Sequence, residues 1–332
     1  MEFSIRAYED NLPMRPWPSL AGKAFCLEFN SRPGETIFFY DDKANNDTTA
    51  SPPIIVLVHG LGDEADSWRH IIPLLGARGF RVLALDLPGF GRSKTIVKGR
   101  VSLKSHAETV LQLIEAVTRK DKIEGAPVFL AGNSLGALIA EAAAFKKQGS
   151  QAIKGLILID GSIPGGPANP GLLALAKILL SRKWYRAYRN DPEGAWASLY
   201  PYYADLKKMP EADRDFLKER VMARVKSSTQ EKAYFQTQRS IIWAFLFASS
   251  PYVKKVRNYS GKILLVWGDK DRIIPLSSAQ EFKNLREDIK LEIIPGAGHL
   301  PQQEKPEETA KIIAEFVERE REEKAVKPKL SV

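Results

Sequence analysis

The stretch Pro127-Val128-Phe129-Leu130-Ala131-Gly132-Asn133-Ser134-Leu135-Gly136, which runs on into the alanine-rich segment 137–144, decides the fold of this 332-residue chain. An apolar run leads into a glycine–serine turn, and helix-forming residues follow at once. This order predicts a strand, a sharp turn and a helix. Ser134 is expected to adopt a strained backbone conformation that exposes its hydroxyl at the end of a sheet. Gly132 and Gly136 would let the strand and the helix pass closely, which is typical of a nucleophile elbow.

Other short apolar runs lie on both sides of this elbow. Each is six or seven residues long, and most neighbouring pairs are separated by a segment with helical periodicity. Continuous apolar runs are typical of strands that are buried on both faces of a parallel sheet. We therefore predict a doubly wound, mostly parallel α/β sheet. The predicted strands are 54–59, 81–86, 127–132, 154–160, 262–268 and 289–295, and the predicted helices are 65–78, 102–119, 135–147, 277–285 and 306–321.

The longest interruption of this alternation covers residues 161–255. The segment has helical periodicity without a strong strand, and it contains 14 of the 31 aromatic residues. Open α/β sheets bind ligands at the carboxyl ends of their strands, so we interpret the segment as an α-helical cap inserted over that edge. The predicted organisation is an N-terminal arm at 1–20, an α/β core at 21–160 and 256–320, the cap at 161–255, and a charged, disordered tail at 321–332. Within the core, two β-rich runs at 24–29 and 36–40 predict a hairpin.

The composition, with 44% hydrophobic and 27% charged residues, is that of an ordinary globular protein. The net charge of +9 comes almost entirely from residues 161–255, which hold 16 Lys and Arg against 8 Asp and Glu. No zinc-ligand spacing or RNP-like run accompanies that charge, which argues against nucleic-acid binding. The N-terminus does not resemble a secretory signal, and no apolar run approaches the roughly 18 residues of a membrane helix. Cys26 is the only cysteine, which fits a reducing compartment, so we expect a cytoplasmic protein. We also expect no metal, no cofactor and no integral membrane segment.

If Ser134 is a nucleophile, it needs a base and an acid. In this fold class the partners follow in the order serine, acid, histidine, and His299 is the only histidine after Ser134. It lies in a glycine-rich loop after the last predicted strand. The acid should follow another strand and accept a hydrogen bond from the imidazole. Three aspartates meet that condition, and they are ranked Asp271, Asp160 and Asp269.

Acyl transfer also requires hydrogen-bond donors for the oxyanion of the tetrahedral intermediate. The backbone N–H of Leu135, directly after Ser134, is one predicted donor. The second should come from the loop after the strand that ends in His59, and we choose the N–H of Leu61. His59 itself is interpreted as structural.

Taken in order, these motifs resemble the α/β-hydrolase family with a helical cap, over roughly residues 20–320. The resemblance rests on His59-Gly60, Asp86-Leu87-Pro88-Gly89-Phe90-Gly91-Arg92-Ser93, the elbow, the stretch 268–275 and Gly298-His299. It implies Ser134 as nucleophile, His299 as base and then acid, and Asp271 as the orienting carboxylate. Relatives that open epoxides or remove halides carry aspartate at the nucleophile position, so the serine argues against both activities.

The leading functional hypothesis is a serine hydrolase that cleaves small-molecule carboxylic esters through an acyl-enzyme. The Gly-Asn-Ser start of the elbow also resembles hydrolases that cleave carbon–carbon bonds of ring-fission products, although Ala137 and Gly62-Asp63-Glu64 depart from their pattern. An acyltransferase or thioesterase and a non-catalytic ligand receptor stay open as alternatives. The predicted substrate pocket, which would take an acyl or aromatic group, contains Asn133, Trp184, Tyr188 and Trp243.

Four basic residues of the predicted cap allow two interpretations. They are interleaved with aromatic residues, which favours an amphipathic helix with a solvated basic face. Alternatively, they would meet an anionic group of the substrate. The four residues are Arg182, Lys183, Arg186 and Arg189.

Overall fold

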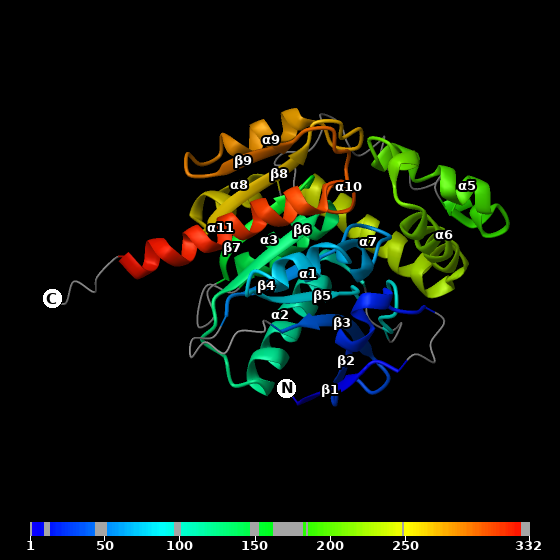
Figure 1. Ribbon diagram of the computed structural model, residues 1–332, viewed down its shortest axis with the longest axis horizontal. Coiled ribbons are helices and arrows are strands. Elements are labelled where there is room, and N and C mark those ends of the chain that lie inside the picture. The colour runs from blue at the N-terminus through cyan, green and yellow to red at the C-terminus, as the bar shows by residue number, and fades with distance from the viewer. Residues whose placement is uncertain are drawn as a thin grey trace.

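A single mixed sheet organises the molecule (Figure 1). The computed structural model describes residues 2–9, 14–43, 52–95, 101–146, 153–161, 182–183, 185–247 and 249–326. The sheet has nine strands in the order β1-β2-β3-β5-β4-β6-β7-β8-β9. Its first three strands pair antiparallel, and every pair from β5–β4 to β8–β9 is parallel. The predicted doubly wound, mostly parallel sheet is therefore confirmed.

The central parallel strands β4 and β5 are buried on both faces, and their side chains are apolar except for Arg81. Every residue of β4 (Ile54–Val58) and of β5 (Arg81–Leu85) is buried, and such strands need helices on both sides. The predicted hairpin at 24–29 and 36–40 is present as β2 and β3. The remaining strands are β1 (Phe3–Ala7), β2 (Ala24–Phe29), β3 (Thr36–Asp42), β6 (Val128–Asn133), β7 (Ile153–Ile159), β8 (Lys262–Gly268) and β9 (Lys290–Ile294).

Helices cover both faces of the sheet and divide the core into two apolar layers (Figure 1). On one face, α2 (Leu103–Lys120) and α3 (Leu135–Lys146) pack together, and α9 (Leu276–Lys283) lies beside β8. On the other face, α1 (Ile71–Gly76) packs against α11 (Pro306–Val326). The sheet is thus shielded from water on both sides, and only its edges and strand ends are available for a site.

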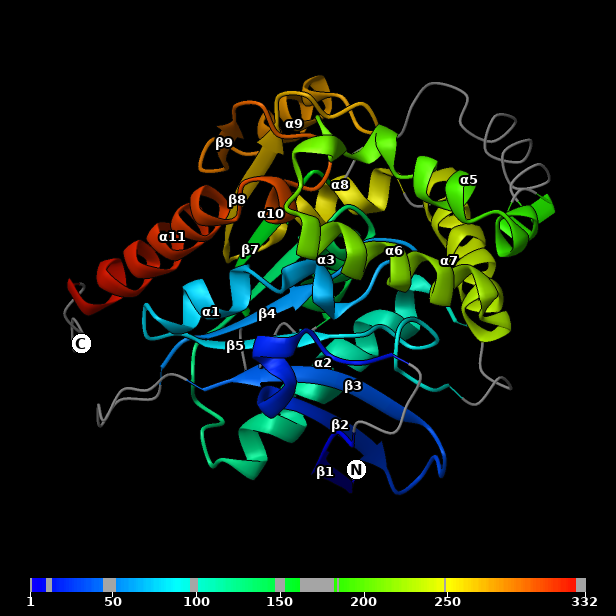
Figure 2. The same ribbon diagram turned by 45° about the vertical axis from the view of Figure 1, so that its right-hand side comes forward.

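The described helices between β7 and β8 are here called the helical insert (182–183, 185–247 and 249–258). Its helices α5, α6 and α7 stand at one end of the molecule, and α8 leads back towards β8 (Figures 1 and 2). Their bounds are α5 Pro192–Ala197, α6 Glu211–Lys226, α7 Ser228–Phe247 and α8 Ser249–Asn258. The predicted cap also includes 162–181 and Trp184, which lie outside the described residues. Among the helices that the structure describes, none has the length and apolar character required to cross a membrane.

Buried ion pairs attach the helical insert to the core. Glu64, on the loop after β4, is completely buried and accepts from Arg220 Nε at 2.7 Å and from Arg224 Nη2 at 2.7 Å. Burial acts to raise the pKa of Glu64, but the positive charges of Arg220 and Arg224 outweigh it and lower that pKa well below its ordinary value. Glu64 is therefore a carboxylate in the folded state, and it joins α6 to the loop beside the elbow.

The predicted arm at 1–20 contains strand β1, in which Phe3 and Ile5 alternate with polar residues and which pairs with β2. Two local expectations were wrong. The single helix expected at 65–78 is divided into a short 3-10 helix (Ala65–Trp68) and α1. The expected tail at 321–332 begins as helix, since α11 continues to Val326, and residues 327–332 are outside the described part of the chain.

His106 provides a test of how the core and the insert pack. It lies fully buried on α2, with Nε2 2.9 Å from the hydroxyl of Thr237 on α7, and burial lowers its pKa to about 3. The unfolded chain, with a histidine pKa of about 6.5, binds the proton more readily, so stability falls as the pH falls from about 6.5 towards 3. We expect His106→Gln to make this acid-side loss shallower by up to about 1.4 kcal/mol per pH unit in urea unfolding. An unchanged slope in the variant would contradict a buried neutral His106.

Candidate active site

Ser134 occupies the sharp turn between β6 and α3. Its φ of +54° is in the left-handed region, and its N–H donates to the carbonyl of Ile159 at 2.9 Å. The flanking glycines are required by close contact: a Cβ on Gly132 would lie 2.2 Å from the backbone of Gly136, and one on Gly136 would lie 2.1 Å from Val58 O. The predicted strand, turn and helix of the elbow are therefore confirmed, and the backbone strain holds the Ser134 side chain at the end of the sheet.

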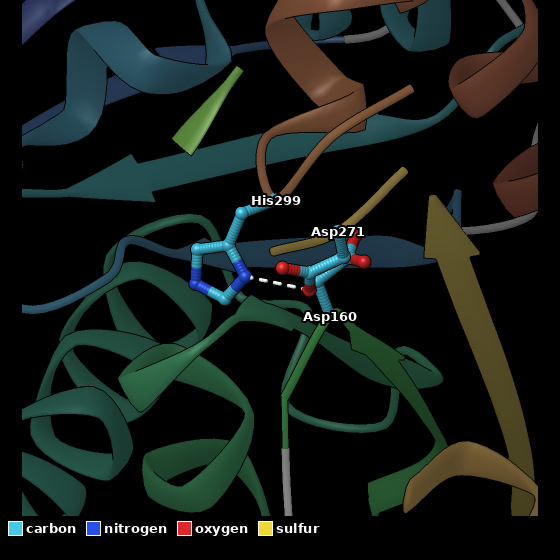
Figure 3. A group of neighbouring side chains, drawn as sticks. All are labelled: Asp160, Asp271 and His299. Carbon is cyan, nitrogen blue, oxygen red and sulfur yellow. Dashed lines mark hydrogen bonds and ion pairs between the residues drawn. The ribbon is translucent and has the colours of Figure 1, made fainter. Parts of the chain in front are cut away.

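His299 is placed by the loop between β9 and α10 (Pro301–Glu304). Its Nδ1 lies 2.8 Å from Asp271 Oδ2 (Figure 3), and both side chains are almost completely buried. The other carboxylate oxygen of Asp271 accepts from the N–H groups of Ile273 at 2.7 Å and Ile274 at 3.0 Å. With Nδ1–H donated to Asp271, the lone pair at Nε2 is left as the basic site of the ring.

The three candidate acids take different places. Asp269 Oδ1 accepts from the N–H of Gly296 at 2.6 Å, so this residue joins the loop after β8 to the loop after β9. Asp160, at the end of β7, is completely buried beside Asp271 (Figure 3). Burial, and then the charge of Asp271, raise the pKa of Asp160 well above its ordinary value. Of the three, Asp271 is the carboxylate that contacts His299.

Metal binding at this cluster is disfavoured by its hydrogen bonds. The nearest side-chain atoms of Asp160, Asp271 and His299 lie within 4.8 Å of one another, a spacing that a metal ion would also require. However, Nδ1 of His299 and Oδ2 of Asp271 contact each other directly, and Oδ1 of Asp271 is occupied by two N–H groups. The geometry is that of a hydrogen-bonded histidine–aspartate pair.

The loop after β4 passes beside the elbow. A Cβ on Gly60 would lie 3.5 Å from the Ser134 Cβ. His59 Nε2 accepts from the N–H of Leu87 at 2.9 Å, so Nδ1 carries the proton and donates to Gly60 O at 2.7 Å. Burial lowers the pKa of His59, which keeps the ring neutral, and its two hydrogen bonds hold this loop. His59 thus has the structural role expected from the sequence.

The oxyanion donors chosen from the sequence have suitable positions. Leu135 is the first residue of α3, where N–H groups lack partners within the helix. Leu61 borders the same cavity as Ser134. Their action on an oxyanion stays a prediction.

A cavity of about 450 Å³ lies where the helical insert meets the core. Ser134 and His299 both border it, as do Gly60 and Leu61. Five tyrosines also line it, among them Tyr185, whose hydroxyl donates to Arg224 O at 3.1 Å and whose pKa burial raises to about 12. The tyrosines that line the cavity are Tyr185, Tyr188, Tyr202, Tyr203 and Tyr234. Such a wall accepts rings and chains while offering polar contacts.

The predicted pocket residues are only partly brought together. Tyr188 lines the cavity, but Trp243 does not: it is 63% exposed on α7, whose outer face it occupies. Asn133 borders the cavity, yet its amide nitrogen donates to His299 O at 3.0 Å and to Ile159 O at 3.2 Å. Asn133 therefore joins the elbow to the histidine loop. Trp184 is outside the described residues.

The basic residues of the insert are organised by one carboxylate. Glu231, which is 5% exposed, pairs with Arg186 at 2.8 Å, with Arg189 at 2.6 Å and with Arg182 at 3.7 Å, and Lys183 is exposed. None of the four is among the residues that line the cavity. This arrangement favours the interpretation as a basic helix face over contact with the substrate.

Sequence reasoning missed most of the tyrosine wall and also Arg224. The run Tyr200-Pro201-Tyr202-Tyr203 was the available signal, because aromatic residues cluster there without helical spacing. Arg224 lines the cavity while pairing with Asp63 and Glu64. No local pattern in the sequence indicates this pairing.

The fold and the site define a class: α/β proteins that carry a serine on a nucleophile elbow and a histidine–aspartate pair at the same end of the sheet. The profile of the alpha/beta hydrolase family matches residues 55–312, and the chain belongs to that family.

Two curated relatives and one solved structure are similar to this chain. The 2-hydroxy-6-oxononadienedioate/2-hydroxy-6-oxononatrienedioate hydrolase of Cupriavidus pinatubonensis is 25% identical over 280 residues, which cover 82% of this chain and 89% of that protein. The pimeloyl-[acyl-carrier protein] methyl ester esterase of Methylococcus capsulatus is 28% identical over 271 residues, covering 82% and 97%. A thermophilic esterase from Thermogutta terrifontis, 22% identical, aligns with a TM-score of 0.67 over 90% of this chain and 98% of that chain and supports the fold.

Proposed function

We propose that this hydrolase cleaves carboxylic esters of small molecules, with Ser134 as nucleophile, His299 as general base and then acid, and Asp271 as the orienting carboxylate. The observation that carries the proposal is the buried His299–Asp271 hydrogen bond of 2.8 Å at the border of the cavity that also contains Ser134. A buried carboxylate on Nδ1 stabilises the imidazolium that forms when Nε2 takes a proton.

The reaction has two balanced steps. Ser134 Oγ attacks the ester carbonyl while His299 Nε2 takes the hydroxyl proton, and the N–H groups of Leu61 and Leu135 stabilise the oxyanion. Collapse breaks the bond to the alcohol, which leaves with that proton, and an acyl-serine remains. Water then attacks the acyl-serine with His299 again as the base, and the acid and the free serine are released.

Cleavage of a carbon–carbon bond in a ring-fission product is a second candidate of about equal support. The relative from Cupriavidus pinatubonensis is named for such a substrate, whereas the one from Methylococcus capsulatus is a methyl ester esterase. The tyrosine wall suits either substrate, since its hydroxyls offer contacts to polar groups and its rings to an apolar chain or aryl group.

A substrate panel separates the two candidates. We expect kcat/KM for p-nitrophenyl esters of graded chain length to exceed that for a 2-hydroxy-6-oxo-dienoate by at least about 10-fold, a difference of about 1.4 kcal/mol in transition-state binding. The reverse order would replace the ester proposal by the carbon–carbon one.

Added alcohols and thiols test transfer to acceptors other than water. Transacylated product in place of the acid would identify an acyltransferase. Tight ligand binding with turnover far below 1–10³ per second, the usual enzyme range, would identify a receptor.

A further inference from the structure

Asp160 is a buried carboxyl group whose surroundings do not suit a carboxylate. It ends β7 with a φ of +42°, and its N–H donates to Val266 O at 3.0 Å. Its Oδ1 accepts from the N–H of Gly268 at 2.9 Å, while Oδ2 is buried and finds no donor among the described residues. Instead, the side chain faces the carboxylate of Asp271 (Figure 3).

Two carboxylates in contact without a donor between them repel each other, and burial prevents water from screening the charge. Both oxygens of Asp271 already accept hydrogen bonds, Oδ1 from the N–H groups of Ile273 and Ile274 and Oδ2 from His299. Oδ1 of Asp160 is occupied by an N–H group. The one arrangement in which both side chains are satisfied places a proton on Oδ2 of Asp160.

We propose that Asp160 is held as a neutral carboxylic acid whose Oδ2–H donates to the carboxylate of Asp271, which makes it a positioning residue for His299. Asp271 is then held from three sides by the two loop N–H groups, the imidazole and the acid of Asp160. The role in catalysis rests on the proposed function, whereas the protonation of Asp160 does not. Glu304 of α10 is the other carboxyl group that acts on Asp160, and it is occupied by the N–H groups of Gly298 and Ala204 at 2.7 Å each.

Asparagine is the matched replacement for a protonated aspartic acid at this position. Its oxygen accepts from the N–H of Gly268, and its NH₂ donates to Asp271, so both contacts are kept without a charge. Asp160→Ala removes both contacts. The comparison of the two variants separates the hydrogen bond to Asp271 from the charge.

We expect Asp160→Asn to keep kcat/KM within about twofold of the wild type and to leave the acidic limb of its pH profile in place. Asp160→Ala should lose about 10- to 100-fold in kcat with a smaller change in KM, because a hydrogen bond to a charged group has been removed. Urea unfolding of the Asp160→Ala protein checks that this variant is folded. If Asp160 were ionised in the wild type, Asp160→Asn would remove a negative charge near His299 and move the acidic limb to lower pH by more than about one unit, which would overturn the proposal. Wild-type kinetics in Asp160→Ala would overturn it as well.

A substrate-free measurement makes the two proposals separable. Infrared difference spectra of the wild type against Asp160→Asn at neutral pH should show the C=O band of a protonated carboxylic acid. A carboxylate band in its place would overturn the protonation of Asp160, even in an active esterase. A wild-type protein that cleaves no ester but shows the acid band would overturn only the proposed function.

Discussion

Ser134→Ala is expected to lower kcat on p-nitrophenyl esters by at least about 10⁴-fold, because the proposed mechanism forms the acyl intermediate on the Ser134 hydroxyl. The side chain sits on a strained turn that holds it at the border of the cavity, at the end of the sheet where the His299–Asp271 pair also lies. The substitution removes one oxygen from a partly exposed side chain, so stability should be almost unchanged. Initial rates, corrected for spontaneous hydrolysis, measure the loss.

Ser277→Ala is the matched control for that variant. Ser277 is an exposed residue near the start of α9, and its removal should leave the rate within about twofold. A Ser134→Ala protein that retained more than about a tenth of the wild-type kcat would show that another residue is the nucleophile.

Glu64→Ala should lower the free energy of unfolding by about 3–5 kcal/mol. The substitution leaves the buried guanidinium groups of Arg220 and Arg224 without the carboxylate that accepts from Arg220 at 2.7 and 3.0 Å and from Arg224 at 2.7 Å. Arg220 keeps Asp66 at 3.1 Å and Arg224 keeps Asp63 at 2.9 Å, but both arginines are buried and lose the carboxylate that they share. Urea unfolding followed by tryptophan fluorescence measures the loss.

Glu315→Ala supplies the comparison for the same amino-acid change. Glu315 pairs with Lys311 at 3.8 Å on the exposed face of α11, so its removal should change stability by at most about 0.5 kcal/mol. Similar losses in the two variants would mean that the Glu64 ion pairs contribute no more than an exposed pair.

The elbow and the parallel strands could be predicted because their determinants are local. Val128 to Ala131 are apolar at every position, as a strand buried on both faces must be, and the turn at Ser134 has glycines at the two positions where the backbones touch. His299 could also be predicted, since the order of the catalytic partners requires a histidine after Ser134 and His299 is the only one there. The structure adds its contact with Asp271.

Features that depend on long-range contacts could not be predicted in the same way. Glu64 and Arg220 are 156 residues apart, and nothing near either of them indicates the other. Trp243 was expected in the pocket because it is aromatic, yet α7 turns it outward. Asp160 was ranked as an alternative acid, and only the fold shows that it faces Asp271 while Asp271 contacts His299.

The most direct test of the proposed mechanism is mass spectrometry of the protein after reaction with a fluorophosphonate and, separately, after rapid quenching during turnover of an activated ester. We predict one phosphonyl group per chain, and a trapped acyl group, both on the peptide that contains Ser134, with no labelling of Ser134→Ala. Hydrolysis of the ester without any adduct on Ser134, or with the adduct on another residue, would contradict the account.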